Sequence, residues 1–291
     1  MYDYFDFQDT GFAYVHTPIL TSSDCEGGSN SFQVQNDFFA SSTFLSVSGQ
    51  LHLESVAQNG FTFGPVFRAE KHHTPRHLAE FWMLEAELMF VDDINTLMDH
   101  VEAALRFPCS RWKCIEEIKY LNDKSGTNVE AGFLEKPIRR ITYDEAIFEL
   151  RQSTENFKYP CSEEMVLHTE HEKYLSRNSP VFITNYPISQ KPFYMKEKHG
   201  RAENFDLIFP RVGEIAGGSL REDNFEILLK QISDRGLDSS KYDWYLDLRR
   251  YGSAPHGGFG IGFDRMIQFW SGAENIRDVT LFPRTEGKIF A

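Results

Sequence analysis

The chain has 291 residues with a formal net charge of -13, and 41% of the residues are hydrophobic. This size supports one large core, or a core with an inserted subdomain. The acidic balance excludes a general nucleic-acid coat, because phosphate contacts need Lys and Arg, but it leaves room for a local basic site. No apolar run approaches the roughly 20 residues of a membrane span. The four cysteines lack C-x-x-C spacing, which argues against a zinc site or a disulfide framework.

The first third of the chain predicts strands and two helices. Alternation of apolar and polar residues indicates a strand, and apolar residues at helical spacing indicate a helix. In chain order we expect a strand over 12–18, a helix over 48–56 with Ser48 as its N-cap, paired strands over 61–70 and 81–89, and a helix over 94–107.

Residues from about 106 to 180 differ in character from the rest. A turn cluster at 124–128, a helix over 143–150 capped by Thr142, and a polar run over 151–172 predict an insertion between two halves of one fold. After it we expect strands over 180–186, 193–196 and 205–209, helices over 225–235 and 242–251, a glycine-rich strand over 259–263, and a final helix over 264–271.

Two short blocks hold charged and aromatic residues in strand-like alternation. The first is Phe67-Arg68-Ala69-Glu70, and the second runs from Arg76 to Glu85 and contains Phe81. In an antiparallel hairpin, one face of such a pair can present an arginine, an acid and an aromatic ring to a single ligand. This combination suits a nucleoside triphosphate.

A second motif combines alternating glycines with an arginine. Gly258, Gly260 and Gly262 lie two residues apart, which flattens one face of a strand so that a planar ligand can lie against it. Arg265 opens the helix that follows, where backbone N–H groups also favour anions.

Two acids lie between these motifs. Asp206 and Glu214 fall on neighbouring strand segments, beside Gly217-Gly218 and Arg221. Mg²⁺ prefers one or two carboxylates together with phosphate oxygens and water, so the pair predicts a magnesium site that ATP phosphates would share. The alternative for either acid alone is a solvated surface charge.

The first two motifs resemble motifs 2 and 3 of the class II aminoacyl-tRNA synthetases, and residues 11–20 resemble motif 1, the weakest of the three. The resemblance covers most of the chain. Among these enzymes it is closest to the asparaginyl members, through residues 44–54, 213–222 and 244–252, and the segments 169–175 and 191–195 look most like the mitochondrial form.

This resemblance implies an α+β fold, in which an antiparallel sheet is flanked by helices and carries a helical insertion. The catalytic domain would consist of residues 1–105 with motifs 1 and 2, the insertion of residues 106–180, and a second half of residues 181–291 with motif 3. The implied function is that of an asparagine–tRNA ligase. Such an enzyme activates asparagine with ATP and Mg²⁺ and transfers it to the acceptor end of tRNA(Asn), as a homodimer with no membrane association.

The resemblance also implies a role for each matched position. Arg68 would pair with the α-phosphate and the attacking carboxylate, and Phe81 and Arg265 would enclose the adenine. Arg76 and His77 would hold the γ-phosphate, while Glu70 would face either the acceptor end or the adenine. The remaining implied contacts are Glu26 with the substrate α-ammonium, Gln50 and Arg221 with the amino-acid pocket, Glu85 with the amide N–H₂, and Asp206 and Glu214 with Mg²⁺.

Leu53 is the implied specificity position. The related aspartyl enzymes carry a lysine there, which pairs with the substrate carboxylate. A leucine removes that cation, and a buried carboxylate without enough cationic partners is costly, so a neutral amide becomes the better ligand.

The family expectation also includes an anticodon-binding domain before the catalytic domain, and we expect this chain to lack it. The mitochondrial location follows from the resemblance alone, since the first residues show no targeting signal. Two alternatives stay open. One is an asparagine synthetase-like enzyme that works through aspartyl-adenylate, and the other is a truncated paralogue without catalysis.

Overall fold

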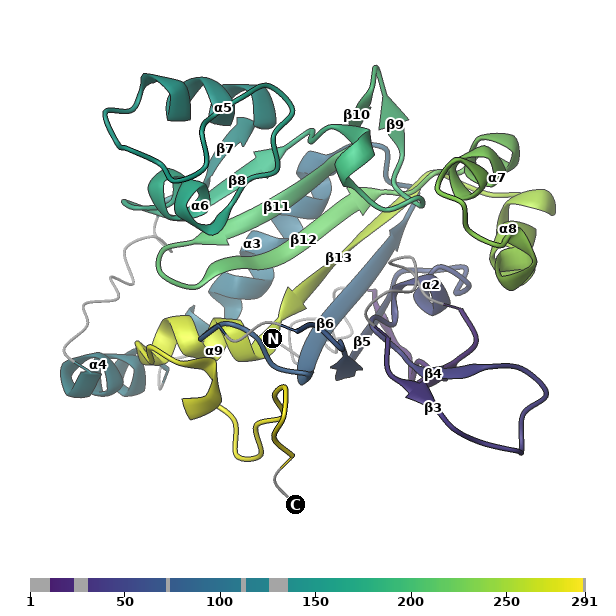
Figure 1. Cartoon of the computed structure of the whole chain (residues 1–291), viewed down its shortest axis with the longest axis horizontal. Coiled ribbons are helices and arrows are strands. Elements are labelled where there is room, and N and C mark those ends of the chain that lie inside the picture. Colours follow the sequence, from purple (N-terminus) through teal and green to yellow (C-terminus); the bar gives the residue numbers. More distant parts are fainter. Residues whose placement is uncertain (1–10, 24–30, 72–73, 111–113, 126–135, 290–291) are drawn as a thin grey trace.

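An eight-stranded sheet runs through the middle of the molecule (Figure 1). The structure is a computed structural model that describes residues 11–23, 31–71, 74–110, 114–125 and 136–289. The strand order is β1 (Ala13–Tyr14), β5 (Gly60–Phe67), β6 (Glu80–Met89), β13 (His256–Gly262), β12 (Gly213–Leu220), β11 (Asn204–Phe209), β8 (Val181–Thr184) and β7 (Arg139–Thr142). The six inner strands are antiparallel, whereas β1 and β7 pair in parallel with β5 and β8.

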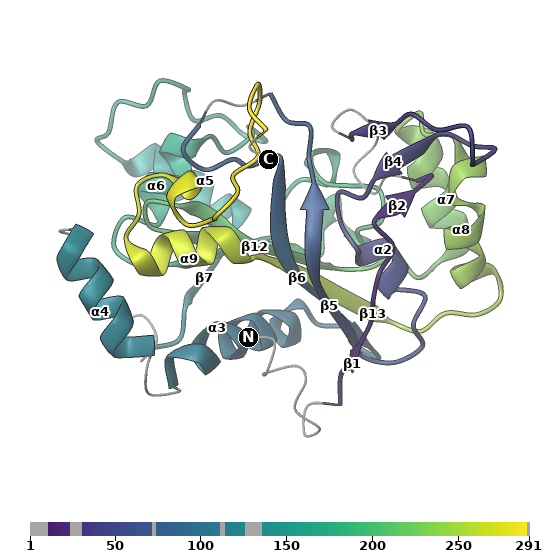
Figure 2. The ribbon, with the colours of Figure 1, turned by 90° about the horizontal axis from the view of Figure 1, so that it is seen from below.

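Side-chain alternation along β6 separates the core from the site. Leu84, Ala86 and Leu88 are buried in the main core together with Leu97 and Met98 of helix α3 (Ile94–Ser110). Because successive strand residues point to opposite faces, Phe81, Met83, Glu85 and Glu87 lie on the other face of the sheet. Helix α3 packs along one face of the sheet in both views (Figures 1 and 2). The opposite face is therefore the one that forms the site.

Two groups of helices pack at the ends of the sheet. At one end, α2 (Gln50–Leu53) shares a core with α7 (Phe225–Asp234) and α8 (Asp243–Arg250). At the other end, α5 (Tyr143–Gln152) and α6 (Thr169–Leu175) share a core with β7 and β8. The remaining elements are α4 (Cys114–Ser125), α9 (Phe263–Ser271), the 3-10 helices η2 (Ile188–Gln190), η3 (Ser239–Tyr242) and η4 (Ile276–Asp278), the sheet of β2 (Leu20–Thr21), β4 (Thr43–Leu45) and β3 (Gln33–Val34), and the pair β9 (Glu197–Lys198) and β10 (Arg201–Ala202).

Most of the predicted elements are confirmed. The pairing of β5 with β6 is antiparallel, with Gly60 opposite Glu87 and Phe67 opposite Glu80. Thr142 caps α5 through a capping box, in which its hydroxyl accepts from the Glu145 N–H at 3.2 Å. The antiparallel sheet with flanking helices agrees with the expected α+β class.

The helix predicted over 48–56 is wrong in length and in its cap. Helix α2 spans only Gln50–Leu53, and its N-cap residue is Gly49. The Ser48 hydroxyl donates to the Glu85 carboxylate on β6. The same hydroxyl accepts from the Gln50 N–H at 3.1 Å, so Ser48 lies one residue before the N-cap and links the start of α2 to β6.

The strand predicted over 193–196 is also wrong. Phe193 and Tyr194 lie in a turn, and only Met195 forms an isolated bridge, with Arg221. The aromatic rings that suggested a strand pack instead into the core shared with α7 and α8.

Residues 106–180, expected as a helical insertion, contribute helices α4, α5 and α6 and also a strand. Strand β7 pairs in parallel with β8, with Ile141 opposite Ile183, and forms one edge of the main sheet. This segment therefore shares the sheet with the two flanking halves.

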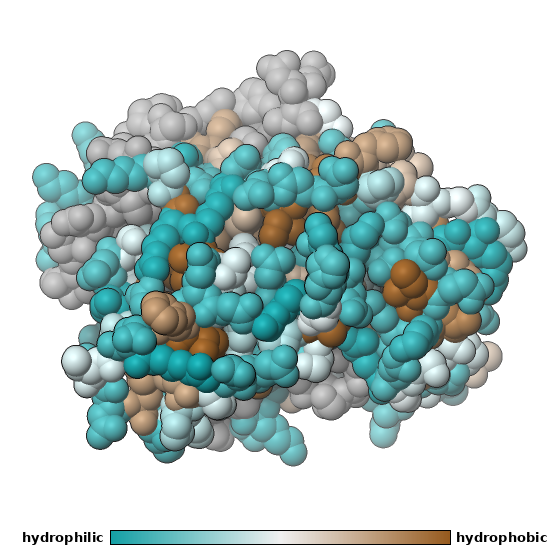
Figure 3. Space-filling view, turned by 90° about the horizontal axis from the view of Figure 1, so that it is seen from above, coloured by the Kyte–Doolittle hydropathy of each residue, from teal (hydrophilic) through white to brown (hydrophobic). Residues whose placement is uncertain are grey.

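Hydrophilic side chains cover most of the face drawn in Figure 3, where apolar residues appear in small, separate patches. None of the helices in the described ranges is long and apolar enough to cross a membrane.

Candidate active site

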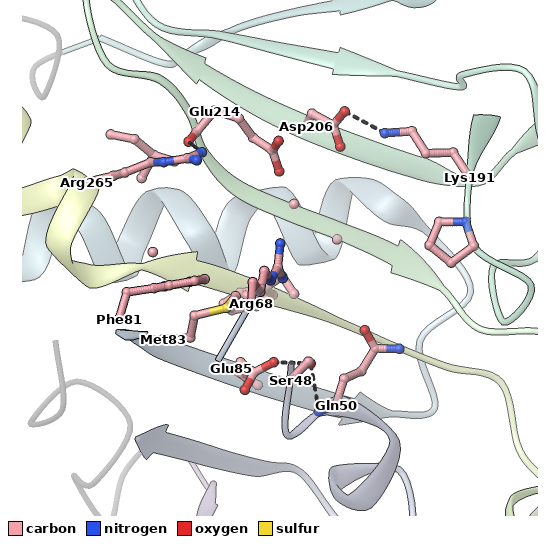
Figure 4. Close-up of a pocket in the computed structure, with 18 of the residues that line it drawn as sticks. Ser48, Gln50, Arg68, Phe81, Met83, Glu85, Lys191, Asp206, Glu214 and Arg265 are labelled. Atoms are coloured by element: carbon pink, nitrogen blue, oxygen red, sulfur yellow. Dashed lines mark hydrogen bonds and ion pairs between the residues drawn. The ribbon is translucent and has the colours of Figure 1, made fainter. Parts of the chain in front are cut away.

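A pocket of about 420 Å³ lies over the face of the sheet opposite α3 (Figure 4). Its walls come from α2, the loop before β6, strands β6, β11, β12 and β13, and the start of α9. The hairpin, the glycine-rich strand and the acidic pair that the sequence singled out therefore meet in one cavity. Of the predicted site residues, it is lined by Gln50, Leu53, Arg68, Glu70, Arg76, His77, Phe81, Glu85, Asp206, Glu214, Arg221 and Arg265.

One end of the pocket combines an aromatic ring with two arginines. The Arg68 guanidinium lies 5.5 Å from the centroid of the Phe81 ring. Arg265 Nη1 donates to the Glu214 carbonyl at 2.7 Å, and the Trp82 N–H donates to Asp264 at 2.8 Å, which fixes α9 against β6. Burial lowers the pKa of Arg265 from its ordinary high value. This end suits a flat ring that carries negative charge.

Glycines of β13 form the floor between the two ends. A Cβ on Gly260 would lie 2.5 Å from the Met83 Cε, and one on Gly258 would overlap the Ala86 carbonyl and the Glu87 carboxylate. At Gly258, where a Cβ would meet backbone, only glycine keeps β13 this close to β6, whereas at Gly260 the Met83 methyl could move aside.

Asp206 and Glu214 lie on neighbouring strands of the opposite wall (Figure 4). Both carboxylates flank Gly217, where a Cβ would lie 3.1 Å from Glu214 Oε1 and 3.6 Å from Asp206 Oδ1. Burial, with Asp206 as the next cause, raises the pKa of Glu214 to about 7. Lys191, which the sequence analysis missed as a site residue, donates from Nζ to Asp206 Oδ2 at 2.5 Å.

This acidic pair fits a divalent cation. Burial is the main cause of the raised pKa of Glu214 and the charge of Asp206 the next, so a cation placed between the two carboxylates would stabilise both in their charged forms. Among the described residues, no group of three or more His, Cys, Asp and Glu is placed to hold a metal alone. Asp206 and Glu214 therefore suit an ion, such as Mg²⁺, that takes its other ligands from phosphate and water.

The other end of the pocket holds Gln50, Leu53 and Glu85. Glu85 accepts from the Gly49 N–H at 2.8 Å in addition to the Ser48 hydroxyl, and it is 4% exposed. Burial raises the pKa of Glu85. Leu53 is 1% exposed and presents an apolar surface beside these polar groups.

Arg221 was expected to face the amino-acid ligand, and most of its donors already have partners. Its Nε and Nη2 each donate to Glu87 at 3.0 Å, and its Nη1 donates to the Ser219 hydroxyl at 2.7 Å. Burial acts against the charge of Arg221, but Glu87 outweighs it and raises the pKa of the arginine. The positive charge at this end is thus already balanced by Glu87.

A buried ionic cluster lies behind this end. Glu54 accepts from Arg249 Nη2 at 2.6 Å, from the Tyr245 hydroxyl at 2.8 Å, and lies 3.1 Å from His256 Nε2. Arg221 Nε is 3.9 Å from the same carboxylate. His256 therefore belongs to this cluster and contacts Glu54.

Arg76 and His77 line the pocket and also hold partners outside it. Arg76 donates to Glu172 and Thr169 of α6 at 3.2 and 2.7 Å. His77 contacts the Thr74 hydroxyl through Nδ1 and lies 3.8 Å from Glu70 through Nε2.

The sequence analysis missed Glu87 and Lys191, which line the pocket, and Glu54 and Glu172, which lie outside it and contact Arg221 and Arg76. One signal was present for Glu87, because it lies two residues after Glu85 on a strand and therefore shares its face. Glu26, predicted to receive the substrate ammonium, lies outside the described residues.

A family model described as "tRNA synthetases class II (D, K and N)" matches residues 1–286. The chain belongs to this family. It is 42% identical to an asparagine–tRNA ligase of Microcystis aeruginosa over 96% of the chain and 66% of that protein. It is also 42% identical to a probable mitochondrial asparagine–tRNA ligase of Dictyostelium discoideum, over 96% of the chain and 65% of the relative.

A solved structure shows the same fold. The crystal structure of asparaginyl-tRNA synthetase from Pyrococcus horikoshii, complexed with asparaginyl-adenylate, superimposes with a TM-score of 0.89 at 36% identity. The match covers 97% of this chain and 65% of that chain. The resemblance predicted from the sequence is confirmed, and the chain spans about two thirds of the length of the relatives it matches.

Proposed function

We propose that this chain carries the catalytic site of an asparagine–tRNA ligase. It would activate asparagine with ATP to asparaginyl-adenylate and then transfer the asparaginyl group to the 3′ end of tRNA(Asn). The observation that carries the proposal is one pocket that joins an arginine-and-aromatic end to a polar end with Leu53 in its wall. The names of the relatives support the same choice.

The nucleotide would occupy the end formed by Phe81 and Arg265. An aromatic ring and a guanidinium that line one slot can enclose a purine between them. Arg68, 5.5 Å from the Phe81 ring, would then face the α-phosphate with its planar fork of donors. Arg76 and His77 would reach the terminal phosphates, and Glu70 would remain beside the adenine or the acceptor end.

The first step needs position and charge rather than a covalent nucleophile. The α-carboxylate of asparagine attacks the α-phosphate in line, the bond to the β-phosphate oxygen breaks, and pyrophosphate leaves. Arg68 would hold both the carboxylate and the phosphate that it attacks, and it would neutralise the charge that gathers between them. In the second step, the 3′-terminal ribose hydroxyl of the tRNA takes the acyl group and releases AMP.

Asp206 and Glu214 would hold Mg²⁺. The ion, when bound, neutralises phosphate charge and orients the triphosphate. Lys191, which contacts Asp206, would add a further positive charge on the same wall.

Asparagine would be preferred over aspartate because the charges at the amino-acid end are already balanced. Glu87 occupies Arg221, so a substrate carboxylate would enter without an unpaired cation to meet it. A neutral amide needs only donors and acceptors, which the remaining Arg221 N–H groups, Gln50 and Glu85 would supply. Leu53 removes the cation that the aspartyl enzymes carry at this position.

Several broader features belong to the same proposal. The partners would be asparagine, ATP and the acceptor end of tRNA(Asn), and the active form would be a homodimer. The catalytic domain would consist of residues 1–105 and 181–291, with 106–180 inserted between them. The similarity to a relative named as mitochondrial supports a location in the mitochondrial matrix.

Charging of a tRNA(Asn) transcript with radiolabelled asparagine tests both chemical steps together. We expect ATP-dependent label on the tRNA, and we expect Arg68→Ala to abolish it because the α-phosphate contact is lost. Label from aspartate in place of asparagine, or no labelled tRNA with either, would contradict the proposal.

A further inference from the structure

A side-chain clasp ties the loop before β6 to helix α6. Arg76 Nη1 donates to Glu172 Oε2 at 3.2 Å and to the Val212 carbonyl at 3.5 Å, and Nη2 donates to Thr169 Oγ1 at 2.7 Å. These partners are 93 to 136 residues away from Arg76 in the chain. The clasp therefore exists only in the folded site.

Two further features hold Arg76 in one place. Its carbonyl accepts from Arg265 Nε at 3.3 Å, and the Pro75 carbonyl accepts from the Ile276 N–H at 2.9 Å, which anchors the backbone on the motif 3 side. Gly213 makes room for the guanidinium, because a Cβ at this position would overlap Arg76 Nη1 and lie 3.1 Å from Glu172 Oε2. Gly213 also has a positive φ of 77°, which suits glycine.

The clasp leaves part of the guanidinium available to a ligand. Both hydrogens of Nη1 and one hydrogen of Nη2 are engaged, and no acceptor for Nε or for the second Nη2 hydrogen is found in the part of the chain that the structure describes. Arg76 lines the pocket, and its side chain is 16% exposed. A guanidinium fixed on one edge and open on the other is preorganised to bind an anion.

We infer that Glu172 and Thr169 of α6 are positioning residues for ATP, because they hold Arg76 at the phosphate end of the pocket. The inference rests on the proposed binding of ATP and extends it to the segment 106–180, in which no site residue was predicted. Glu172 does not line the pocket, so it acts through Arg76.

Direct ATP binding and steady-state exchange test this role together. Calorimetry with a non-hydrolysable ATP analogue and Mg²⁺ would be run on the wild type, Glu172→Ala, Thr169→Val, Arg76→Ala and the double variant of Arg76 and Glu172. We expect Glu172→Ala to weaken the analogue about tenfold and to raise the KM for ATP equally, with the KM for asparagine and kcat little changed. The double variant should bind no more weakly than Arg76→Ala alone.

Two variants separate positioning from general stability. Glu172→Gln keeps an oxygen that accepts from Nη1 and should retain most of the affinity. Glu163→Ala removes an exposed ion pair with Arg151, 3.4 Å apart, that also lies within residues 106–180. This variant should leave the affinity for the ATP analogue unchanged. The inference is overturned if Glu172→Ala binds the analogue like the wild type, if its loss adds to that of Arg76→Ala, or if kcat falls with KM unchanged.

The same data distinguish this inference from the proposed function. A wild type that binds the analogue but gives no asparagine-dependent exchange would contradict the ligase proposal, while the binding series would still support or overturn the clasp. A wild type that does not bind the analogue would overturn both.

Discussion

Glu54 and Arg249 form a fully buried ion pair, in which Arg249 Nη2 donates to Glu54 Oε2 at 2.6 Å across 195 residues of chain. The pair joins α2, which carries Gln50 and Leu53 into the pocket, to α8. Neither charge is exposed to solvent, and Tyr245 donates to the same carboxylate at 2.8 Å. The position of the amino-acid end of the pocket thus depends on a contact behind it.

Glu54→Gln should lower the free energy of unfolding by about 3–5 kcal/mol at pH 7, because it leaves Arg249 buried without its counter-charge. Urea denaturation followed by circular dichroism measures this. Glu163→Ala, at an exposed pair, serves as the control and should change the free energy by less than about 0.5 kcal/mol. If the free energy of unfolding fell by the same small amount in both variants, the buried pair would not stabilise the fold as proposed.

The same variant should show a defined pH dependence. Burial alone would raise the pKa of Glu54, but Arg249 and His256 outweigh burial and hold the pKa well below its ordinary value of 4.5. A depressed carboxyl pKa contributes stability above the unfolded-state value and loses it as pH falls toward the folded-state value. The difference between wild type and Glu54→Gln should therefore shrink below about pH 4.5. A difference that grows on acidification would contradict this sign.

Gly258→Ala should destabilise the protein by about 1–3 kcal/mol, because the new Cβ would overlap the Ala86 carbonyl in the centre of the sheet. Gly64→Ala on β5 is the matched control, since a Cβ there meets no described atom within 4 Å. Thermal unfolding of both variants measures the difference. Equal melting temperatures would show that β13 can move away from β6.

The sequence predicted what depends on local pattern. The hairpin of β5 and β6, helix α3, the Thr142 cap and the flat face of β13 all follow from residue spacing, and all are present. The strand predicted at 193–196 failed because distant contacts hold Phe193, and the helix predicted over 48–56 is shorter than its pattern indicated. Ser48 meets Glu85 across the site, and Phe193 packs against Tyr242 and Tyr245.

The residues of the candidate site also divide into those that the sequence predicted and those that it missed. Twelve predicted residues line the pocket because the family pattern carries them. The carboxylates that form ion pairs with two of these arginines were missed. Glu87 lies 134 residues from Arg221 in the chain, and Glu172 lies 96 residues from Arg76. Composition and periodicity hold no information about such pairs until the fold brings them together.

Asp206→Asn should raise the Mg²⁺ concentration needed for half-maximal pyrophosphate exchange by about tenfold, because one of two carboxylate ligands is lost. Asp223→Asn is the control. Asp223 pairs with Lys196 at 3.1 Å outside the pocket, and its loss should leave the Mg²⁺ dependence unchanged. Parallel Mg²⁺ titrations would decide, and identical curves for both variants would remove Asp206 from the metal site.

Leu53→Lys should shift the preference between the two amino acids. A new ammonium in a buried, charge-balanced end favours the aspartate carboxylate, so exchange with asparagine should fall by at least about tenfold relative to exchange with aspartate. Leu53→Met keeps the size and the neutrality and should keep the preference. An unchanged ratio of the two kcat/KM values in Leu53→Lys would show that this position does not set specificity.

The most direct test is amino-acid-dependent ATP–pyrophosphate exchange on the purified chain, run in parallel with asparagine and with aspartate. This one measurement reports both whether the adenylate forms and which of the two amino acids the pocket prefers. We predict exchange with asparagine, with a kcat/KM at least about tenfold above that for aspartate, which corresponds to about 1.4 kcal/mol of discrimination. Exchange that is equal or faster with aspartate, or absent with both amino acids, would contradict the assignment of this pocket to asparagine activation.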